Sequence, residues 1–200
     1  MTANRPYIVG LTGGIACGKS NLSEVLRSRG AVVVDADEIS RAFTAEGGRA
    51  LPAIRARFCD QVFEGELLNR RALSDAVFGH PRALADLNAL MHPMVFEEID
   101  DQIARHADRA ALVIDIPLLY ETGFEARCDE VWCAYAPPAH QVQRLLQRGM
   151  TREEALRRID SQMPAMEKAK RSDRVIITTG DKADNANHVI RLWDALLRRI

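Results

Sequence analysis

The sequence predicts an α/β fold in which a five-stranded parallel sheet lies between layers of helices. Short apolar, β-branched runs alternate with helical patterns along most of the 200 residues, and this alternation is typical of a parallel sheet with helical crossovers. A glycine-rich motif stands between the first apolar run and a helical pattern. A long helical stretch, residues 43–109, separates the second run from the third, which indicates an insertion into the sheet fold.

The first predicted strand covers residues 7–11 and leads into a phosphate-binding motif. Residues 13–20 read GGIACGKS and match G-x-x-x-x-G-K-[ST], and residues 21–29 continue at helical spacing. Glycines let successive N–H groups converge on phosphate oxygens, and the helix adds the positive end of its dipole. We expect Lys19 to reach the β- and γ-phosphates and the Ser20 hydroxyl to bind Mg²⁺. The alternative is a glycine turn that only joins a strand to a helix.

The second predicted strand, residues 31–34, ends in two aspartates, Asp35 and Asp37. In an extended segment their carboxylates share a face, and open α/β sheets bind ligands at the carboxyl ends of their strands. One of them is therefore a candidate general base or metal partner. Alternatively, Asp37 is the N-cap of the next helix, and Arg41, four residues later, only pairs with it. The residues themselves leave these interpretations open.

The insertion, residues 43–109, consists of helical patterns without a strand-like run. Turn signals divide it at Gly47-Gly48, at Gly65 and at two His-Pro pairs. Connections in α/β folds usually span about 2–6 residues, so we expect this one to be functional and to hold the pocket of an acceptor substrate. His92, before Pro93, is a candidate catalyst. A structural role is the more common one, because capping at a helix start explains this histidine without chemistry.

Three further strands are predicted at residues 110–116, 130–135 and 175–177, and a last helix at 189–197. Asp115 ends the first of these apolar runs. At that position an acid can assist a metal beside the phosphates, or it can be satisfied by local hydrogen bonds.

The most basic part of the chain lies between the last two strands. A helix over residues 141–148 carries Arg144 and Arg148, and Thr151 begins a second helix with a capping box. Many such charges are only solvated helix faces. A basic helix pair at this place in the fold is also where a nucleotide kinase would carry a mobile lid, whose arginines clamp the transferring phosphoryl group.

Composition narrows the class of protein. A formal net charge of -1 argues against a general nucleic-acid or membrane-surface protein. The four cysteines form no C-x-x-C pair, so they signal neither a zinc site nor a disulfide framework. The N-terminal residues lack a secretory pattern, and a free thiol inside the phosphate loop fits a reducing compartment. We therefore expect a cytoplasmic protein.

Several segments together resemble the dephospho-coenzyme A kinase family over nearly the whole chain. They are residues 11–20, 35–37 with Arg41, 68–71, 90–93, 117–121, 143–145 with Arg148, and 162–164. The resemblance implies that ATP phosphorylates the ribose 3′-hydroxyl of dephospho-CoA, with Mg²⁺, in the last step of coenzyme A synthesis. It also implies a P-loop kinase-type three-layer sandwich with a helical substrate-binding insertion and a helical lid. The core would comprise residues 1–42, 110–143 and 172–200, the acceptor region 43–109 and the lid 144–171.

The resemblance also implies roles for individual residues. The catalytic residues would be Asp37 and Lys19, and Ser20 would be the metal ligand. The ATP-binding residues would be Gly13, Gly14, Ile15, Ala16, Cys17, Gly18, Lys19, Ser20, Arg144 and Arg148. The acceptor-binding residues would be Asp37, Arg41, His92, Leu118, Leu119, Tyr120 and Glu121. The partners would be ATP and dephospho-CoA, with no nucleic acid or membrane, and the protein would be a monomer or a small homo-oligomer.

Two departures from the family pattern concern the ATP site. Ala16-Cys17 stands where the family usually has Gly-Ser, and alanine restricts the loop if that position needs a positive φ. Thr178-Thr179 replaces the usual residues of a turn that contacts adenine. A second function class also stays open, an NTP-hydrolysing switch whose partners read the bound nucleotide. The helical insertion, the basic segment and the lack of an Asn-Lys-x-Asp signature favour the kinase.

Overall fold

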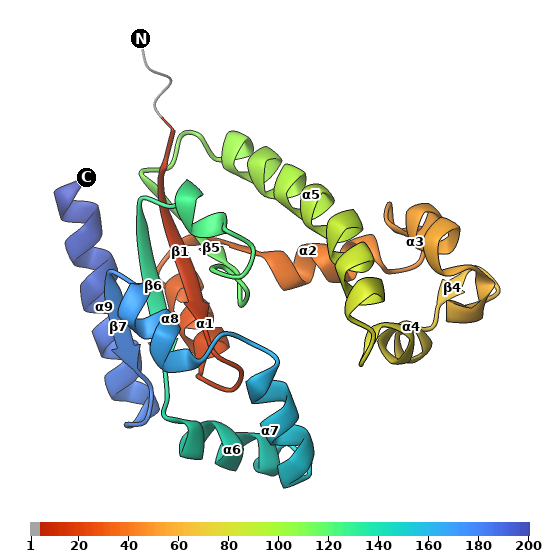
Figure 1. The fold of residues 1–200 in the computed structure, drawn as a ribbon. Helices are drawn as coiled ribbons and strands as arrows, with labels where there is room; N and C mark the ends of the chain where they lie inside the picture. Colours follow the sequence, from red (N-terminus) through yellow and green to blue (C-terminus); the bar gives the residue numbers. More distant parts are fainter. Residues whose placement is uncertain (1–4) are drawn as a thin grey trace. The chain divides into compact units, whose positions relative to one another are not determined.

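The computed structural model describes residues 5–200, and the chain forms two compact units. One comprises the residues up to Val34 together with Ile103–Ile200, and the other comprises Asp35–Gln102. The elements of the first unit are β1 (Tyr7–Gly13), α1 (Lys19–Ser28), β2 (Val32–Asp35, whose last residue begins the second unit), β5 (Ala111–Asp115), β6 (Glu130–Tyr135), α6 (Pro138–Gln147), α7 (Arg152–Asp160), α8 (Ala165–Arg171), β7 (Arg174–Ile177) and α9 (Lys182–Arg199) (Figure 1).

The five strands of the first unit confirm the predicted parallel sheet. Their order is β2-β5-β1-β6-β7, and β1 runs parallel to both β5 and β6. Leu11 pairs with Asp115 on one side of β1, and Thr12 pairs with Cys133 on the other. Because these strands run in the same direction, the loops that follow β1 and β5 leave the sheet at the same edge.

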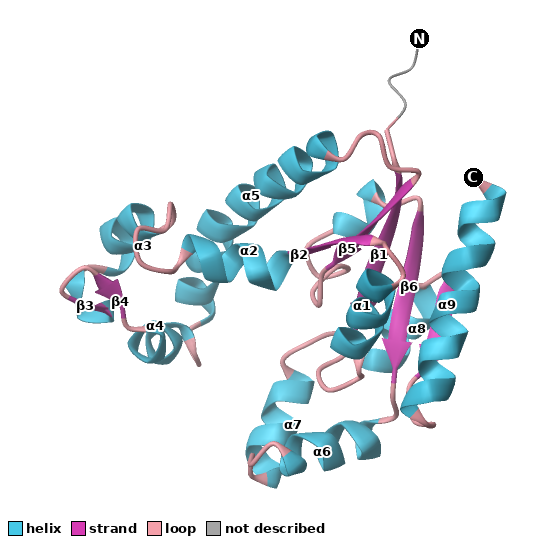
Figure 2. Cartoon of the chain, turned by 180° about the vertical axis from the view of Figure 1, so that it is seen from behind, coloured by secondary structure: helices cyan, strands magenta, loops and turns pink. Residues whose placement is uncertain are grey.

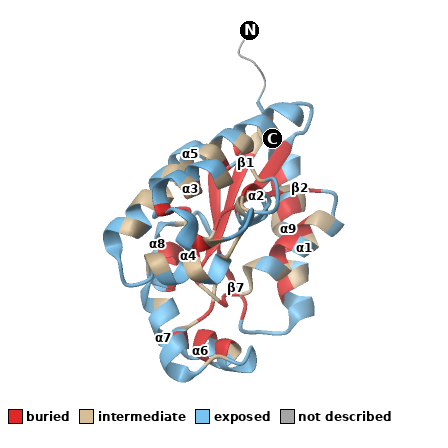
Figure 3. Cartoon of the chain, turned by 90° about the vertical axis from the view of Figure 1, so that its right-hand side faces the viewer, coloured by how far each residue is buried: buried red, intermediate tan, exposed pale blue. Residues whose placement is uncertain are grey.

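Helices cover both faces of this sheet. Helices α1 and α9 pack together on one face, and α8 packs against β1 and β6 on the other (Figures 1 and 2). Strands β1, β5 and β6 are almost entirely buried, and Figure 3 shows buried residues along the strands, with exposed residues on helices and loops. The sheet between two helical layers is the predicted three-layer sandwich.

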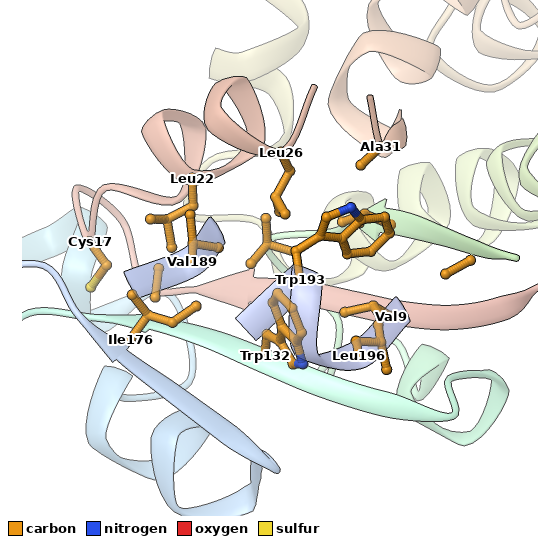
Figure 4. Packing of buried hydrophobic residues seen from close by; sticks show 14 of the residues in the cluster. Val9, Cys17, Leu22, Leu26, Ala31, Trp132, Ile176, Val189, Trp193 and Leu196 are labelled. Carbon is orange, nitrogen blue, oxygen red and sulfur yellow. The ribbon is translucent and has the colours of Figure 1, made fainter. Parts of the chain in front are cut away.

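The main apolar core lies between the sheet and the α1–α9 pair (Figure 4). Trp132 of β6 meets Trp193 of α9 edge to face, with ring centroids 6.5 Å apart, and such a pair adds about 0.5–1.5 kcal/mol to what area burial contributes. Leu22 and Leu26 of α1 are fully buried in the same cluster. Cys17 also belongs to it, so the phosphate-binding motif rests directly on the rigid core.

The second unit is mainly helical, as the sequence predicts, but it also contains a short hairpin. Its elements are α2 (Ala36–Phe43), α3 (Leu51–Phe58), β3 (Phe63–Glu64), β4 (Leu67–Leu68), α4 (Arg70–Val77) and most of α5 (Pro81–Arg105). The expectation of no strand here was wrong. Gly65 (φ +62°) opens a two-residue turn that pairs Phe63 with Leu68. Each strand has only two residues, too few to show an alternating pattern in the sequence.

Helix α5 corrects a second expectation, that the His92-Pro93 pair separates two helices. The helix continues through Pro93, so His92 lies in its interior and caps nothing. Proline has no N–H for the carbonyl one turn back, which usually breaks a helix. Met91, Val95 and Ile99 are buried on both sides of Pro93, and the burial of this apolar face offsets the lost hydrogen bond.

None of the helices in the described part of the chain, residues 5–200, is long and apolar enough to cross a bilayer.

Candidate phosphate-transfer site

The phosphate-binding motif has the geometry that the sequence predicts. Strand β1 ends at Gly13, helix α1 begins at Lys19, and Gly18 between them has a φ of +81°. The N-cap residue of α1 is Gly18, which has no side chain to cap the first turn. The N–H groups at such a helix start are a ready-made anion site.

Two glycines open the loop. A Cβ on Gly13 would lie 2.7 Å from the backbone carbonyl oxygen of Ala134, so glycine is required there. A Cβ on Gly14 would lie 2.8 Å from Nε2 of Gln141, the end of a flexible side chain, and 3.0 Å from the Cβ of Ala165, so the site is tight. Ala16 adopts a φ of +59° without being glycine, a conformation that costs an L-residue about 1–2 kcal/mol. The position that the family usually fills with glycine thus does need a positive φ, and this chain holds alanine there.

Packing explains how Ala16 is kept in this conformation. It is buried in a small apolar cluster with Leu145 of α6 and Ala155 of α7. Cys17 is 1 % exposed, and burial raises the pKa of its thiol. Its Sγ lies 3.8 Å from the carbonyl oxygen of Ala136. The Cys17 side chain therefore points into the protein, so only its main chain can serve a phosphate.

Lys19 and Asp115 form an ion pair at the edge of the sheet. The parallel pairing of β1 with β5 sets Asp115 beside Leu11, two residues before the loop. Asp115 is only 1 % exposed, and its second oxygen accepts a hydrogen bond from Ser23 of α1. A buried carboxylate is tolerated only with such partners. Lys19 and Ser23 thus satisfy the Asp115 carboxylate, and its role beside a metal stays a prediction.

Two glutamines hold the main chain of Ile15 from behind the loop. Gln141 of α6 donates to the Ile15 carbonyl (2.7 Å), and the Oε1 of Gln162 accepts from the Ile15 N–H (3.1 Å). Sequence reasoning gave neither glutamine a role in the site. They stand 126 and 147 residues from Ile15, and no local pattern links a side chain to a backbone group at that distance.

Arg144 also binds the loop through its main chain. Its guanidinium donates to the carbonyl oxygen of Ala16 (2.9 Å) and to that of Thr178. The Thr178 hydroxyl donates in turn to the carbonyl of Cys17 (2.7 Å). Arg144 thus ties the turn after β7 to the phosphate loop, whereas Arg148, at the end of α6, is exposed. Of the two arginines assigned to ATP, only Arg148 is left with its side chain in solvent.

The loop after β5 holds the other predicted site residues of the first unit. Leu119 is fully buried and Tyr120 is 7 % exposed, so any contact between Leu119 and a ligand falls to its main chain. The Tyr120 hydroxyl is 2.8 Å from Ser172 Oγ. Leu118 is half-buried, and the Glu121 carboxylate pairs with Lys168 of α8 (2.8 Å).

The two aspartates after β2 differ in what they do. Asp35 is the N-cap of α2, because its carboxylate accepts from the N–H groups of Asp37 (2.8 Å) and Glu38 (3.0 Å). The interpretation of Asp37 as the cap was therefore wrong. The expectation that both carboxylates share an extended face was wrong too, since α2 begins at Ala36.

The capping by Asp35 leaves the Asp37 side chain without a structural task. It is exposed on the first turn of α2, and within residues 5–200 its carboxylate has no ion pair with Arg41 or hydrogen-bond donor. Arg41 is exposed as well, and its carbonyl accepts from Arg70 (3.0 Å). His92 stacks on Phe96 with ring centroids 6.0 Å apart, and partial burial lowers its pKa.

Within residues 5–200 the site contains oxygen ligands but no preformed metal cage. Among the described residues no group of three or more His, Cys, Asp or Glu side chains could hold a metal ion. The Ser20 hydroxyl is exposed on the first turn of α1. Mg²⁺ usually keeps several waters and takes one or two protein oxygens together with phosphates of the substrate, so these residues fit a cation that arrives with a nucleotide.

Comparison with known proteins gives one consistent result. The family model described as dephospho-CoA kinase matches residues 7–184. A dephospho-CoA kinase of Staphylococcus aureus is 39 % identical over 193 residues, which cover 94 % of this chain and 93 % of that protein.

Two solved structures are also similar along the whole chain. TT1252 from Thermus thermophilus is 34 % identical, with a TM-score of 0.85 over 96 % of this chain and 97 % of that one. The dephospho-CoA kinase from Campylobacter jejuni is 27 % identical, with a TM-score of 0.71 over 96 % and 97 %.

Proposed function

The chain belongs to the dephospho-CoA kinase family, and from this membership we infer that it transfers a phosphoryl group from ATP to dephospho-CoA, at the ribose 3′-hydroxyl. This reaction is the final step of coenzyme A synthesis. The observation that carries the inference is the joint presence of a family match over residues 7–184 and an intact strand–loop–helix phosphate site at Gly13–Ser20.

The phosphate loop and Lys19 bind and polarise the triphosphate. The uncapped N-terminus of α1 offers N–H donors to phosphate oxygens. The Lys19 side chain is 13 % exposed, and its ammonium is held by Asp115 at this helix start. Turning from the carboxylate toward a phosphate keeps the ammonium paired, so it stabilises the charge that develops on the transferring group.

Mg²⁺ would be held by the Ser20 hydroxyl and by the nucleotide itself. When bound, the cation neutralises charge on the phosphates. Ser20 is exposed and so can bind a cation. Ser23, one turn later, is buried, and its hydroxyl donates a hydrogen bond to Asp115.

Asp37 acts as the general base for the acceptor hydroxyl. Its carboxylate is exposed, and helix capping by Asp35 leaves it free to accept a proton. It stands two residues beyond the carboxyl end of β2, the side of the sheet where ligands bind in this class of fold. Deprotonation of the hydroxyl as the phosphoryl group arrives makes the oxygen a better nucleophile.

The remaining predicted roles divide between the two units. Of the residues assigned to the acceptor, Arg41 and His92 belong to the helical unit, Asp35–Gln102, and residues 118–121 belong to the first unit. Within the predicted lid, residues 144–171, helix α8 packs against β1 and β6, so the moving part would end before α8 and would carry the exposed Arg148 toward the transferring phosphoryl group. Both assignments rest on the residues that match the family.

We place the enzyme in the cytoplasm as a monomer or small homo-oligomer with small-molecule substrates. All four cysteines are free thiols, and Cys17 and Cys133 are buried. Free thiols agree with a reducing compartment.

A coupled assay tests the function against the alternative of a nucleotide switch. We expect ADP release that depends on dephospho-CoA and yields a product phosphorylated at the 3′-position. Hydrolysis of ATP that is independent of the acceptor would support the switch instead. Lys19→Met should abolish turnover, and Lys170→Met, an exposed lysine on α8, is the matched control.

The Lys19 variant needs a test of folding, because it leaves Asp115 buried without its cation. The double variant Lys19→Met/Asp115→Asn removes both charges and should regain stability, yet it should remain inactive. Near-parental turnover in the folded double variant would contradict the role given to Lys19.

A further inference from the structure

Lys168 is a fully buried lysine outside the predicted site. Its side chain is 0 % exposed on α8. The ammonium donates to the carbonyl oxygen of Pro117 (2.6 Å) and pairs with both oxygens of Glu121 (2.8 and 3.0 Å). Lysine is almost never buried unless it is paired, because the ammonium loses its hydration. These contacts therefore fix α8 to the loop after β5.

The contacts of Lys168 continue in two directions. The Pro117 carbonyl that it binds also accepts a hydrogen bond from Thr12 of β1 (3.1 Å). The Glu121 carboxylate also accepts from the N–H of Met163 (2.9 Å). Lys168 and Glu121 thus hold the segment that connects α7 with α8 against the loop after β5.

That connecting segment also touches the phosphate loop. Gln162, next to Met163, accepts the N–H of Ile15 (3.1 Å). A continuous path of polar contacts therefore runs from Lys168 through Glu121 and the 162–163 main chain to the backbone of the phosphate loop. All of its members lie in the first unit.

We propose that Lys168 is a positioning residue, which sets the phosphate loop and the Pro117–Glu121 loop in register for phosphoryl transfer. It touches neither substrate and acts through Glu121 and Gln162. Without the ammonium, the Glu121 carboxylate gains hydration by turning away from α8. It then no longer accepts the hydrogen bond from the Met163 N–H, and the neighbouring Gln162 loses its contact with Ile15. The inference rests on the proposed function, in which these two loops serve the phosphoryl donor and the acceptor.

The effect should fall on turnover and not on nucleotide binding. A small misplacement of reacting groups by a distant substitution can cost about 100-fold in rate. We expect Lys168→Met to lower kcat by about tenfold or more, and to leave the Kd for ATP, measured by calorimetry, within about threefold of the parent. A lysine that served stability alone would change the melting temperature and leave the kcat of the folded enzyme unchanged.

A double-mutant cycle in kcat tests the path itself. The variants are Lys168→Met, Gln162→Leu and their combination, assayed in the full chain well below every melting temperature. If both act through the same segment, the double variant should be hardly slower than the slower single variant. Lys170→Met, exposed on the same helix, and Val189→Ala, a buried change on α9, are controls for charge and for stability, and both should keep the parental kcat.

Parental kcat in Lys168→Met, or single effects that multiply in the double variant, would overturn the proposal. Should Lys168→Met fail to fold, the cycle of Glu121→Gln with Gln162→Leu tests the same path, because Glu121→Gln keeps a hydrogen-bonding partner for Lys168. Additive effects in that cycle would equally overturn it. Failure of the proposed function would show differently, as a parent enzyme without acceptor-dependent ADP release.

Discussion

Replacing Asp37 by asparagine separates a catalytic role from a structural one. Asp37→Asn keeps the shape of the side chain and removes the carboxylate that would accept the proton. General-base contributions are typically about 10²–10⁴-fold, which corresponds to about 2.7–5.4 kcal/mol of activation free energy at 1.36 kcal/mol for each tenfold change. We expect kcat with dephospho-CoA to fall within that range.

The structure predicts a much smaller effect on stability. The Asp37 carboxylate is exposed, and Asp35 already caps α2. The change removes only the interaction of a negative charge with the helix dipole, about 0.3–1 kcal/mol. In a domain of this size 1 kcal/mol shifts the melting temperature by about 2–4 °C. ATP should still bind, because Lys19 and the phosphate loop are untouched.

Two variants of Asp35 are the matched controls. Asp35→Asn removes a neighbouring carboxylate while keeping an equally good cap, so it should preserve both activity and melting temperature. Asp35→Ala should cost about 0.5–2 kcal/mol in stability as the cap is lost. The assay is kcat by the coupled reaction beside a thermal melt of each variant. Full activity in Asp37→Asn, or an equal loss in Asp35→Asn, would refute the reasoning.

Three further predictions concern other parts of the chain. Arg148→Ala should lower kcat more than it weakens ATP binding, because a lid contact forms late. Arg144→Ala should lower the melting temperature and weaken ATP binding, because it leaves the carbonyls of Ala16 and Thr178 without this donor. The same pattern of kcat and ATP affinity for both variants, measured by kinetics and calorimetry, would contradict this. Cys59 is exposed at the end of α3 with φ +58° and ψ -172°, a region nearly restricted to glycine, so Cys59→Gly should stabilise the protein by about 1 kcal/mol, and a melt should show no such gain for Cys59→Ala. Burial opposes ionisation of Glu130, but hydrogen bonds from Arg199 and its other donors hold the pKa of that carboxyl below its usual range. The stability that Glu130 contributes is therefore present above the usual glutamate pKa and is lost as pH falls below it. Between about pH 7 and 3.5 the melting temperature should therefore fall less steeply for Glu130→Gln than for the parent.

Much of the fold was determined by local sequence. The β-branched runs at residues 31–34 and 110–116 and the helical spacing after Ser20 specify elements through side-chain periodicity, which needs no knowledge of distant partners. The phosphate loop is equally local, because glycine spacing and the helix start that follows supply the N–H groups themselves. The capping box at Thr151 is present as predicted for the same reason.

The tertiary structure decided which partners the charged and polar side chains found. Asp115 meets Lys19 across 96 residues and Lys168 meets Glu121 across 47, and neither pairing has a local signature. Helix α5 runs through Pro93 because the packing of its apolar face outweighs a local break signal. Periodicity reports which face of an element is buried. It does not report which neighbour covers that face. The tertiary fold brings distant segments together and so determines which residue supplies the counter-ion or the hydrogen bond.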